Sequence, residues 1–249
     1  INMKKNISIL GSTGSIGINS LKIFSKKKKL FKIYILAANK NYKLICKQIY
    51  QFNPEIFFVN DLKVYEKVKK KFKNYKVRII KDIDTKKNYF KKSDITIAAI
   101  PGIAGLKPTV ELIKKSKKIL IANKESVICG WSLIKKTASK HNTHIIPVDS
   151  EHFSIMKLLE NEKKNNVKKI YLTASGGPFL NLNISKLKSV KPHEAIKHPK
   201  WKMGKKISID SATLMNKMLE VIEAHKLFSI EIDKFEIVIH PRVINSCNY

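Results

Sequence analysis

The stretch "NISILGSTGSIGINSLKIF" (6–24) decides the fold class of this chain. It begins with a short β-branched run (6–10), continues through Gly11, Gly14 and Gly17, and ends in a helical pattern (15–24). Glycines in such a turn let a pyrophosphate approach the backbone, and the amides at the helix N-terminus bind the anion. A glycine-rich turn without a ligand is the alternative. The position between a first strand and a first helix favours the dinucleotide-binding interpretation.

The rest of the first 150 residues repeats this alternation of strand and helix. Further β-branched or apolar runs occupy 32–37, 55–59, 94–100, 118–122 and 143–148. Helical patterns lie between most of these runs, for example at 106–115 and 131–140. Nearly continuous apolar strands separated by helices predict an α/β fold, a Rossmann-like doubly wound parallel sheet covered on both faces.

After about residue 150 the rhythm of the sequence changes. A strand pattern at 168–174 is followed by a polar stretch at 180–206, a helical pattern at 211–228 and a last strand pattern at 235–240. We therefore expect two domains: a dinucleotide-binding domain at 1–148 and an α+β catalytic domain at 149–249.

The composition limits the classes of function. The chain has 249 residues and a formal net charge of +31, with lysines spread along its whole length. Because aromatic residues are not interleaved with these lysines, we expect solvated lysine-rich helix faces and no specific nucleic-acid partner. No apolar run approaches the roughly 20 residues of a membrane span. The three cysteines form no C-x-x-C pair, which is typical of a protein that does not depend on disulfides. The first strand pattern begins almost at once, so we also expect no targeting peptide.

The second strand pattern favours NADP over NAD. An NAD site usually has an Asp or Glu near the end of this strand, whereas here the strand ends in "LAANKN" (36–41). Lys40 could meet a 2′-phosphate, or it could be one more surface lysine. The motif "ANKES" (122–126) follows another strand and brings Asn123, Lys124 and Glu125 to the same edge of the sheet. A helix cap followed by an ordinary ion pair remains open for this motif.

The motif "PVDSEH" (147–152) suggests a metal site. Residues two apart in an extended segment point the same way, so Asp149 and Glu151 can converge. Two convergent carboxylates repel each other unless a cation or a proton lies between them, and oxygen ligands suit Mg²⁺ or Mn²⁺. The alternative is that Asp149 or Ser150 caps the following helix.

A candidate third ligand lies in the helical pattern that follows. Asn216, Lys217, Glu220 and Glu223 fall within an arc of roughly 120°. The apolar residues occupy the opposite side of the helix. The alternative is a solvated face with a Lys217–Glu220 ion pair.

Seven motifs in this order resemble the 1-deoxy-D-xylulose 5-phosphate reductoisomerase family: "GSTGSIG", "LIANKES", "PVDSEH", "ASGGPF", "HPKWKMG", "ISIDSATLMNKMLEVIEA" and "IHP". The resemblance implies an NADPH-dependent enzyme that needs Mn²⁺ or Mg²⁺, with Co²⁺ as a further option. It implies conversion of 1-deoxy-D-xylulose 5-phosphate, a phosphorylated sugar, to 2-C-methyl-D-erythritol 4-phosphate in the non-mevalonate isoprenoid pathway. It also implies a homodimer when the chain is complete, in the cytoplasm of a bacterium or in a plastid-type organelle of a eukaryote.

The same resemblance implies a role for individual residues. The NADPH contacts would be Thr13, Gly14, Ser15, Ile16, Asn39, Lys40, Asn41, Asn123, Glu125 and Gly204. The metal ligands would be Asp149, Glu151 and Glu220, and with Lys124 and His198 they form the expected catalytic set. The substrate contacts would be Lys124, Ser150, Glu151, Ser175, His198, Ser211, Asn216, Lys217 and Glu220. Trp201 and Met203 would belong to a lid over the site.

The sequence departs from the family pattern after Pro241, where "RVINSCNY" replaces the usual continuation. We therefore expect the catalytic domain to be incomplete at its C-terminus and the family's C-terminal helical domain to be absent. Two other functions stay open. One is a different NADP-dependent oxidoreductase of the semialdehyde-dehydrogenase type, which would need a catalytic cysteine, and Cys129 lacks a suitable setting for that role. The other is an inactive fragment that binds polyanions.

Overall fold

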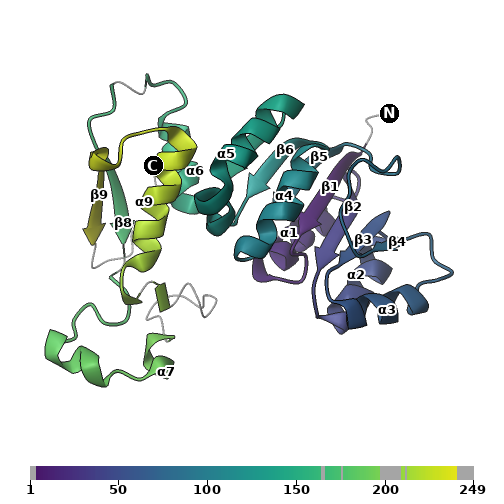
Figure 1. Ribbon diagram of the computed structural model, residues 1–249, viewed down its shortest axis with the longest axis horizontal. Coiled ribbons are helices and arrows are strands. Elements are labelled where there is room, and N and C mark those ends of the chain that lie inside the picture. Colours follow the sequence, from purple (N-terminus) through teal and green to yellow (C-terminus); the bar gives the residue numbers. More distant parts are fainter. Residues whose placement is uncertain (1–3, 164–165, 175, 197–208, 211, 240–249) are drawn as a thin grey trace. The chain divides into compact units, whose positions relative to one another are not determined.

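The computed structural model describes residues 4–163, 166–174, 176–196, 209–210 and 212–239. The chain divides into two compact units, Ile1–Val148 and Asp149–Tyr249 (Figure 1). Each unit has its own hydrophobic core.

The first unit is built on a seven-stranded parallel sheet with the order β4-β3-β2-β1-β5-β6-β7. Its strands are β1 (Lys5–Leu10), β2 (Phe31–Ala38), β3 (Ile56–Val59), β4 (Arg78–Ile80), β5 (Ser93–Ala98), β6 (Ser116–Ile121) and β7 (His144–Pro147). The direction of strand addition reverses between β1 and β5, and ligands of such sheets collect at this switch point, outside the carboxyl ends of the strands.

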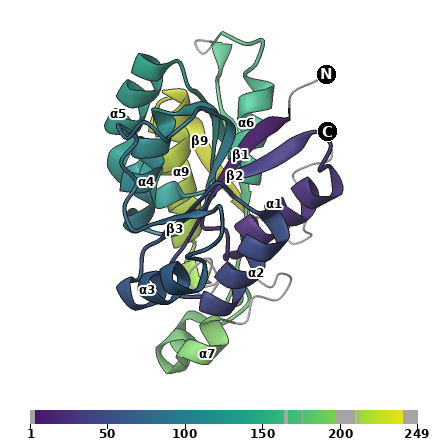
Figure 2. The same ribbon diagram turned by 90° about the vertical axis from the view of Figure 1, so that its right-hand side faces the viewer.

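Helices cover both faces of this sheet. They are α1 (Ser15–Lys26), α2 (Tyr42–Phe52), α3 (Leu62–Lys71), α4 (Leu106–Ile113), which follows the short helix η1 (Ile103–Gly105), and α5 (Lys124–His141). Leu21 of α1, Ile45 of α2 and Val68 of α3 belong to one buried cluster with the strands, so these three helices share a face. α4 and α5 pack together on the other face (Figure 2). The Rossmann-like doubly wound sheet is thereby confirmed.

Two features of this unit differ from the expectations. Strand β4 was not predicted, because its three residues are too few to show a period. Helix α5 begins at Lys124, seven residues earlier than expected, and it is kinked at Gly130, where φ is −128° and ψ is 17°. The glycine interrupts the helical pattern, so only the part after the kink was predicted.

The second unit combines helices with a small sheet. Its elements are α6 (Ser150–Leu158), β8 (Ile170–Ala174), η3 (Ile184–Ser189), α7 (Pro192–Ala195), α9 (Met215–Phe228), η4 (Ile232–Lys234) and β9 (Phe235–Ile239). β8 and β9 pair in parallel. Ile155 of α6, Leu172 of β8 and Val221 of α9 meet in one core, which holds α6 and α9 side by side.

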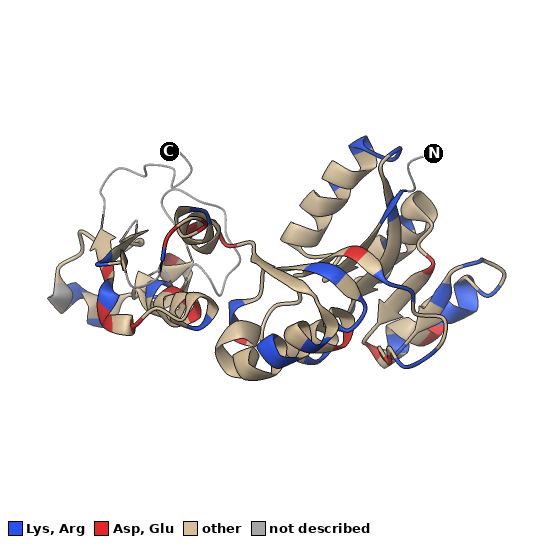
Figure 3. Ribbon diagram, turned by 90° about the horizontal axis from the view of Figure 1, so that it is seen from above, with Lys and Arg blue, Asp and Glu red and all other residues tan. Residues whose placement is uncertain are grey.

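The basic residues are spread over the structure as they are spread along the sequence. Lysine and arginine occur on elements of both units and are not gathered on one element (Figure 3). Among the described residues, none of the helices has the length and apolar character needed to cross a membrane. Cys46 is buried and Cys129 is exposed, and both are free thiols.

Candidate metal centre and dinucleotide loop

Three carboxylates of the second unit converge on one point. Asp149 precedes α6, Glu151 lies in its first turn and Glu220 lies in α9. One carboxylate oxygen from each of the three lies within 4.8 Å of the other two. The structure therefore brings together the three predicted metal ligands, which come from segments about 70 residues apart.

The start of α6 shows that Asp149 is not simply a cap. Asp149 occupies the N-cap position, but its side chain makes no capping hydrogen bond. The Ser150 hydroxyl donates a hydrogen bond to Glu151 Oε2 at 2.7 Å, so this serine orients a carboxylate of the cluster. The capping alternative for "PVDSEH" is thus not supported by the geometry.

Helix α9 turns its polar face inward. Lys217, Glu220 and Glu223 are 6%, 3% and 2% exposed, whereas Met215 and Met218 are half exposed. The alternative of a solvated face is wrong for this helix. Buried charges are costly unless they are paired or bound to a metal, so the burial of three charged residues on one face indicates a site.

Lys217 lies between two of the predicted ligands. Its Nζ is 2.5 Å from Glu220 Oε2 and 3.1 Å from Glu151 Oε1. Burial lowers the pKa of Lys217, but these two carboxylates raise it by more, so the pKa lies above its usual value and the amine stays charged. Asn216 Nδ2 donates to the other oxygen of Glu220 at 2.5 Å.

The Glu151 carboxyl has a depressed pKa. Burial raises this pKa, but the side chain of Asp149, the charge of Lys217 and the hydroxyl of Ser150 together lower it by more. Glu151 is therefore ionised at neutral pH and available as an oxygen ligand.

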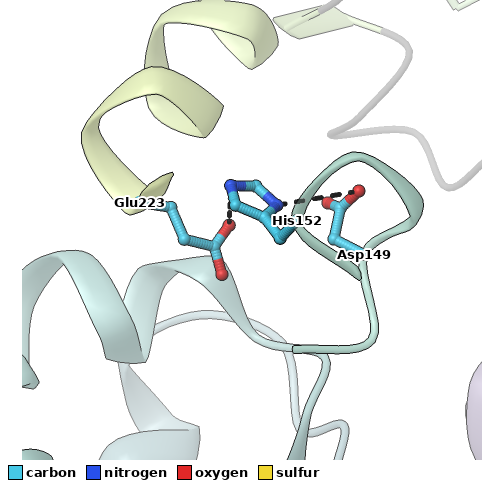
Figure 4. A group of neighbouring side chains, drawn as sticks. All are labelled: Asp149, His152 and Glu223. Atoms are coloured by element: carbon cyan, nitrogen blue, oxygen red, sulfur yellow. Dashed lines mark ion pairs between the residues drawn. The ribbon is translucent and has the colours of Figure 1, made fainter. Parts of the chain in front are cut away.

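Asp149 also belongs to a second group with His152 and Glu223, whose candidate ligand atoms lie within 4.8 Å of one another (Figure 4). Glu223 was expected only as part of the polar arc, and neither it nor His152 was assigned a role from the sequence. The fully buried His152 ring has Nδ1 4.0 Å from Asp149 Oδ1 and Nε2 3.6 Å from Glu223 Oε2. Nε2 also lies 3.0 Å from the backbone oxygen of Glu220. His152 thus touches both segments that carry ligands. Its place three residues after Asp149, on the same side of a helix, was the available signal.

The glycine-rich loop between β1 and α1 is closely packed and open at its tip. Gly11 has a φ of 84°, which favours glycine, and a Cβ at Gly17 would lie 2.3 Å from the Gly11 oxygen. Gly14 is the N-cap of α1 and offers no side chain to the first amides of the helix. Gly14, Ser15 and Ile16 are exposed, while Thr13 is half-buried. These uncapped amides suit an anion.

The neighbouring strand ends carry the other predicted cofactor residues. Asn39, Lys40 and Asn41 follow β2 and are exposed, and Asn41 caps α2 by accepting a hydrogen bond from Leu44 N at 3.1 Å. Asn123 follows β6 and caps α5 by accepting from Ser126 N at 2.9 Å.

Of the alternative considered for "ANKES", a helix cap followed by an ion pair, the structure confirms the helix cap. The Asn123 amide also donates to the backbone oxygens of Ile100 and Gly102, so its side chain is used within the protein. Lys124 and Glu125 occupy the first turn of α5. Cofactor and substrate contacts of these residues stay predictions.

Several predicted residues lie outside the part of the chain that the structure describes. They are Ser175, His198, Gly204 and Ser211, together with the lid residues Trp201 and Met203.

Comparison with known proteins identifies the family. The sequence model described as 1-deoxy-D-xylulose 5-phosphate reductoisomerase matches residues 7–130, and the model of that enzyme's C-terminal domain matches 145–228. The 1-deoxy-D-xylulose 5-phosphate reductoisomerase of Pelagibacter ubique is 52% identical over 241 residues, which are 96% of this chain and 62% of that protein. The enzyme of Thermodesulfovibrio yellowstonii is 45% identical over 98% of this chain and 64% of its own length.

Solved structures agree with the sequence matches. The reductoisomerase from Zymomonas mobilis in complex with NADPH has a TM-score of 0.85 at 36% identity, over 96% of this chain and 62% of that one. A reductoisomerase in complex with NADPH, fosmidomycin and magnesium has a TM-score of 0.85 at 35% identity, over 95% and 61%. The chain spans about 62% of the length of the first curated relatives that it matches. The two family models, the curated relatives and the solved structures agree, and the chain belongs to the 1-deoxy-D-xylulose 5-phosphate reductoisomerase family.

Proposed function

We propose that this chain carries the NADPH-binding and metal-binding parts of an enzyme that converts 1-deoxy-D-xylulose 5-phosphate to 2-C-methyl-D-erythritol 4-phosphate for isoprenoid synthesis. The first unit (1–148) binds NADPH, and the second (149–249) binds the metal and the substrate. The observation that carries the proposal is the convergence of Asp149, Glu151 and Glu220 on one point, beside an inward-facing lysine.

The charge of the cluster fits a divalent cation. Asp149, Glu151, Glu220 and Glu223 contribute four negative charges when ionised, and Lys217 contributes one positive charge. The net charge of these five side chains is then −3, and a protonated His152 would make the net charge of the cluster −2. Three carboxylate oxygens match the preference of Mg²⁺ and Mn²⁺ for hard ligands, and relatives have been solved with magnesium.

The metal, when bound, acts as a Lewis acid on oxygens of the substrate. The protein's own contribution is to hold the ligands in place. The Ser150 hydroxyl fixes Glu151, the Asn216 amide fixes Glu220, and the ring of His152 lies against Asp149. Rigid ligands of this kind preorganise the site for the reaction. Lys217 keeps a positive charge beside the ligands, where the substrate's developing negative charge and its phosphate would be stabilised.

The first unit fits a dinucleotide with a 2′-phosphate. The open amides at the start of α1 suit the pyrophosphate, and exposed Lys40 at the end of β2 suits the 2′-phosphate. NADPH, when bound, supplies the hydride of the reduction. We further propose that the complete protein is a homodimer that takes a phosphorylated sugar as its substrate. Its location would be the cytoplasm of a bacterium or a plastid-type organelle.

The test is NADPH oxidation, followed at 340 nm, with 1-deoxy-D-xylulose 5-phosphate and with or without Mn²⁺. We expect turnover that needs the metal, and binding of fosmidomycin that needs the metal if the chain is too short to turn over. Absence of both, together with salt-sensitive binding to DNA, would favour the polyanion-binding alternative.

The choice of cofactor has its own experiment. NADPH should bind much more tightly than NADH, because the end of β2 offers a lysine and no carboxylate. Lys40→Glu should narrow this gap by weakening NADPH. Lys47→Glu, at an exposed position in the middle of α2, is the matched control and should leave the ratio of affinities nearly unchanged. Equal affinities of the unmodified chain for both cofactors would contradict the assignment.

A further inference from the structure

Two buried polar side chains lie beneath the glycine-rich loop, and the family resemblance gives neither of them a role. Ser12 is 0% exposed and follows Gly11 in the loop. Gln48 is 3% exposed and lies in α2 among the apolar residues Ile45 and Ile49. A buried amide costs free energy unless it is hydrogen-bonded, so its bonds show what it does.

Ser12 and Gln48 bind each other in both directions. The Ser12 hydroxyl donates to Gln48 Oε1 at 2.7 Å, and Gln48 Nε2 donates to the backbone oxygen of Ser12 at 2.8 Å. The backbone N–H of Ser12 donates to the Ala37 oxygen at 2.8 Å. The carbonyl of Ser12 is therefore hydrogen-bonded to α2, and the N–H of Ser12 is hydrogen-bonded to β2.

These bonds fix the direction of the next amide. In a trans peptide the C=O of one residue and the N–H of the following residue point in opposite directions, and the described chain has no cis peptide. Because the Ser12 oxygen faces Gln48 in the interior, the N–H of Thr13 points away from the interior. Gly14 and Ser15, the next residues of the chain, are exposed.

We propose that Gln48 is a positioning residue for the cofactor: by holding the Ser12 carbonyl inward, it aims the Thr13 amide at the pyrophosphate of NADPH. The inference rests on the proposed NADPH-binding function. Gln48 does not touch the cofactor itself. Its effect reaches the pyrophosphate through one peptide group.

The place of Gln48 in α2 strengthens this role. The helix begins beside Asn41, in the segment expected to meet the 2′-phosphate, and Gln48 lies seven residues later, about 10 Å along the axis. One helix thus holds the pyrophosphate loop at one point and presents the 2′-phosphate segment at another. A methionine would fill nearly the same volume without an amide to satisfy, so packing alone does not require glutamine here.

The test compares Gln48→Met with Thr143→Val. Both changes remove a buried hydrogen-bonding group from the first unit, since Thr143 Oγ1 donates to the backbone oxygens of Ile113 and Ser116 at 2.7 and 2.9 Å. Thermal unfolding measures the stability of each variant, and NADPH fluorescence titration gives the dissociation constant well below the lower melting temperature. We expect Gln48→Met to weaken NADPH binding about tenfold and Thr143→Val to change it less than twofold.

A ligand that lacks a pyrophosphate distinguishes a misdirected Thr13 amide from a general loss of structure in the variant. Adenosine 2′-monophosphate should bind Gln48→Met and the unmodified protein equally, as measured by NMR titration. Unchanged NADPH affinity in Gln48→Met, or an equal loss for both ligands, would overturn the inference. If Gln48→Met does not fold, Gln48→Glu replaces it, since the carboxylate keeps the shape but cannot donate to the Ser12 oxygen.

The unmodified protein gives a further readout. The Thr13 amide proton should shift strongly when NADPH is added, and a shift confined to the other loop amides would overturn the inference. A protein that does not bind NADPH at all would instead contradict the proposed function. The two failures are therefore distinguishable.

Discussion

The positive charge of Lys217 lies beside two of the carboxylates that are proposed to bind the metal. The amine lies between Glu151 and Glu220, and these carboxylates keep its pKa raised despite burial. An ammonium group and a divalent cation repel each other, so Lys217 and the metal would compete for the carboxylate oxygens of Glu151 and Glu220. The residue thus stabilises the metal-free cluster and at the same time limits metal affinity.

Lys217→Met tests this competition. The change leaves buried carboxylates without their amine, so we expect the metal-free protein to lose on the order of 3 kcal/mol of unfolding free energy. Mn²⁺ should then bind about tenfold more tightly and raise the melting temperature by more than in the unmodified protein. Lys157→Met, which breaks the exposed Lys157–Glu160 pair, is the control and should change neither quantity appreciably. Weaker Mn²⁺ binding in Lys217→Met would show that the lysine supports the metal.

In the turn between β1 and α1, Gly17 and Gly14 have different roles. A Cβ at Gly17 would lie 2.3 Å from the Gly11 oxygen and 2.6 Å from Ser12 Cα, so backbone must move. At Gly14 the nearest atom is 3.4 Å away, and its φ of −83° suits alanine. Gly17 is needed for packing, whereas Gly14 borders the open tip.

Two alanine variants should therefore behave differently. Gly17→Ala should cost about 2 kcal/mol of unfolding free energy, seen as a lower melting temperature. Gly14→Ala should keep its melting temperature and lose NADPH affinity, because the new methyl group stands where the pyrophosphate approaches. A stable Gly17→Ala protein, or full NADPH affinity in Gly14→Ala, would contradict this division.

The elements also show which features were predictable from the sequence. The long apolar strands of the sheet and the helix after Gly14 followed directly from periodicity, because doubly buried strands are nearly continuously apolar. β4 and the first turns of α5 did not, since one is too short and the other is interrupted by Gly130. For α9 the arc of polar residues was correct, but periodicity cannot tell which face is buried.

The candidate site was predictable to a similar degree. Asp149 and Glu151 are close in sequence, and the period of a helix places Glu220 on one polar arc with Asn216, Lys217 and Glu223. The family resemblance then implied that Glu220 is the ligand. His152 escaped notice because its role depends on contacts with Asp149 and with α9, which only the fold brings together. Gln48 was missed because a glutamine in an amphipathic helix is ordinarily solvated.

At the scale of the whole molecule, the two units should respond to different ligands. Each has its own core, and the dinucleotide loop and the carboxylate cluster lie in different units. In hydrogen exchange followed by mass spectrometry, NADPH should protect segments 11–17 and 39–44. Mn²⁺ should protect 149–153 and 216–221, because a ligand lowers the frequency of opening where it binds. Protection of one segment set by both ligands would indicate a shared site.

A Mn²⁺ titration of Asp149→Asn, Glu151→Gln and Glu220→Gln tests the proposed metal site most directly. Each change keeps the shape of a proposed ligand and removes its charge, on which the affinity of a hard cation depends strongly. We predict that each weakens Mn²⁺ binding at least tenfold, that the effects in double variants are far from additive, and that NADPH affinity is retained. Unchanged Mn²⁺ affinity in all three variants would contradict the metal site and with it the proposed function.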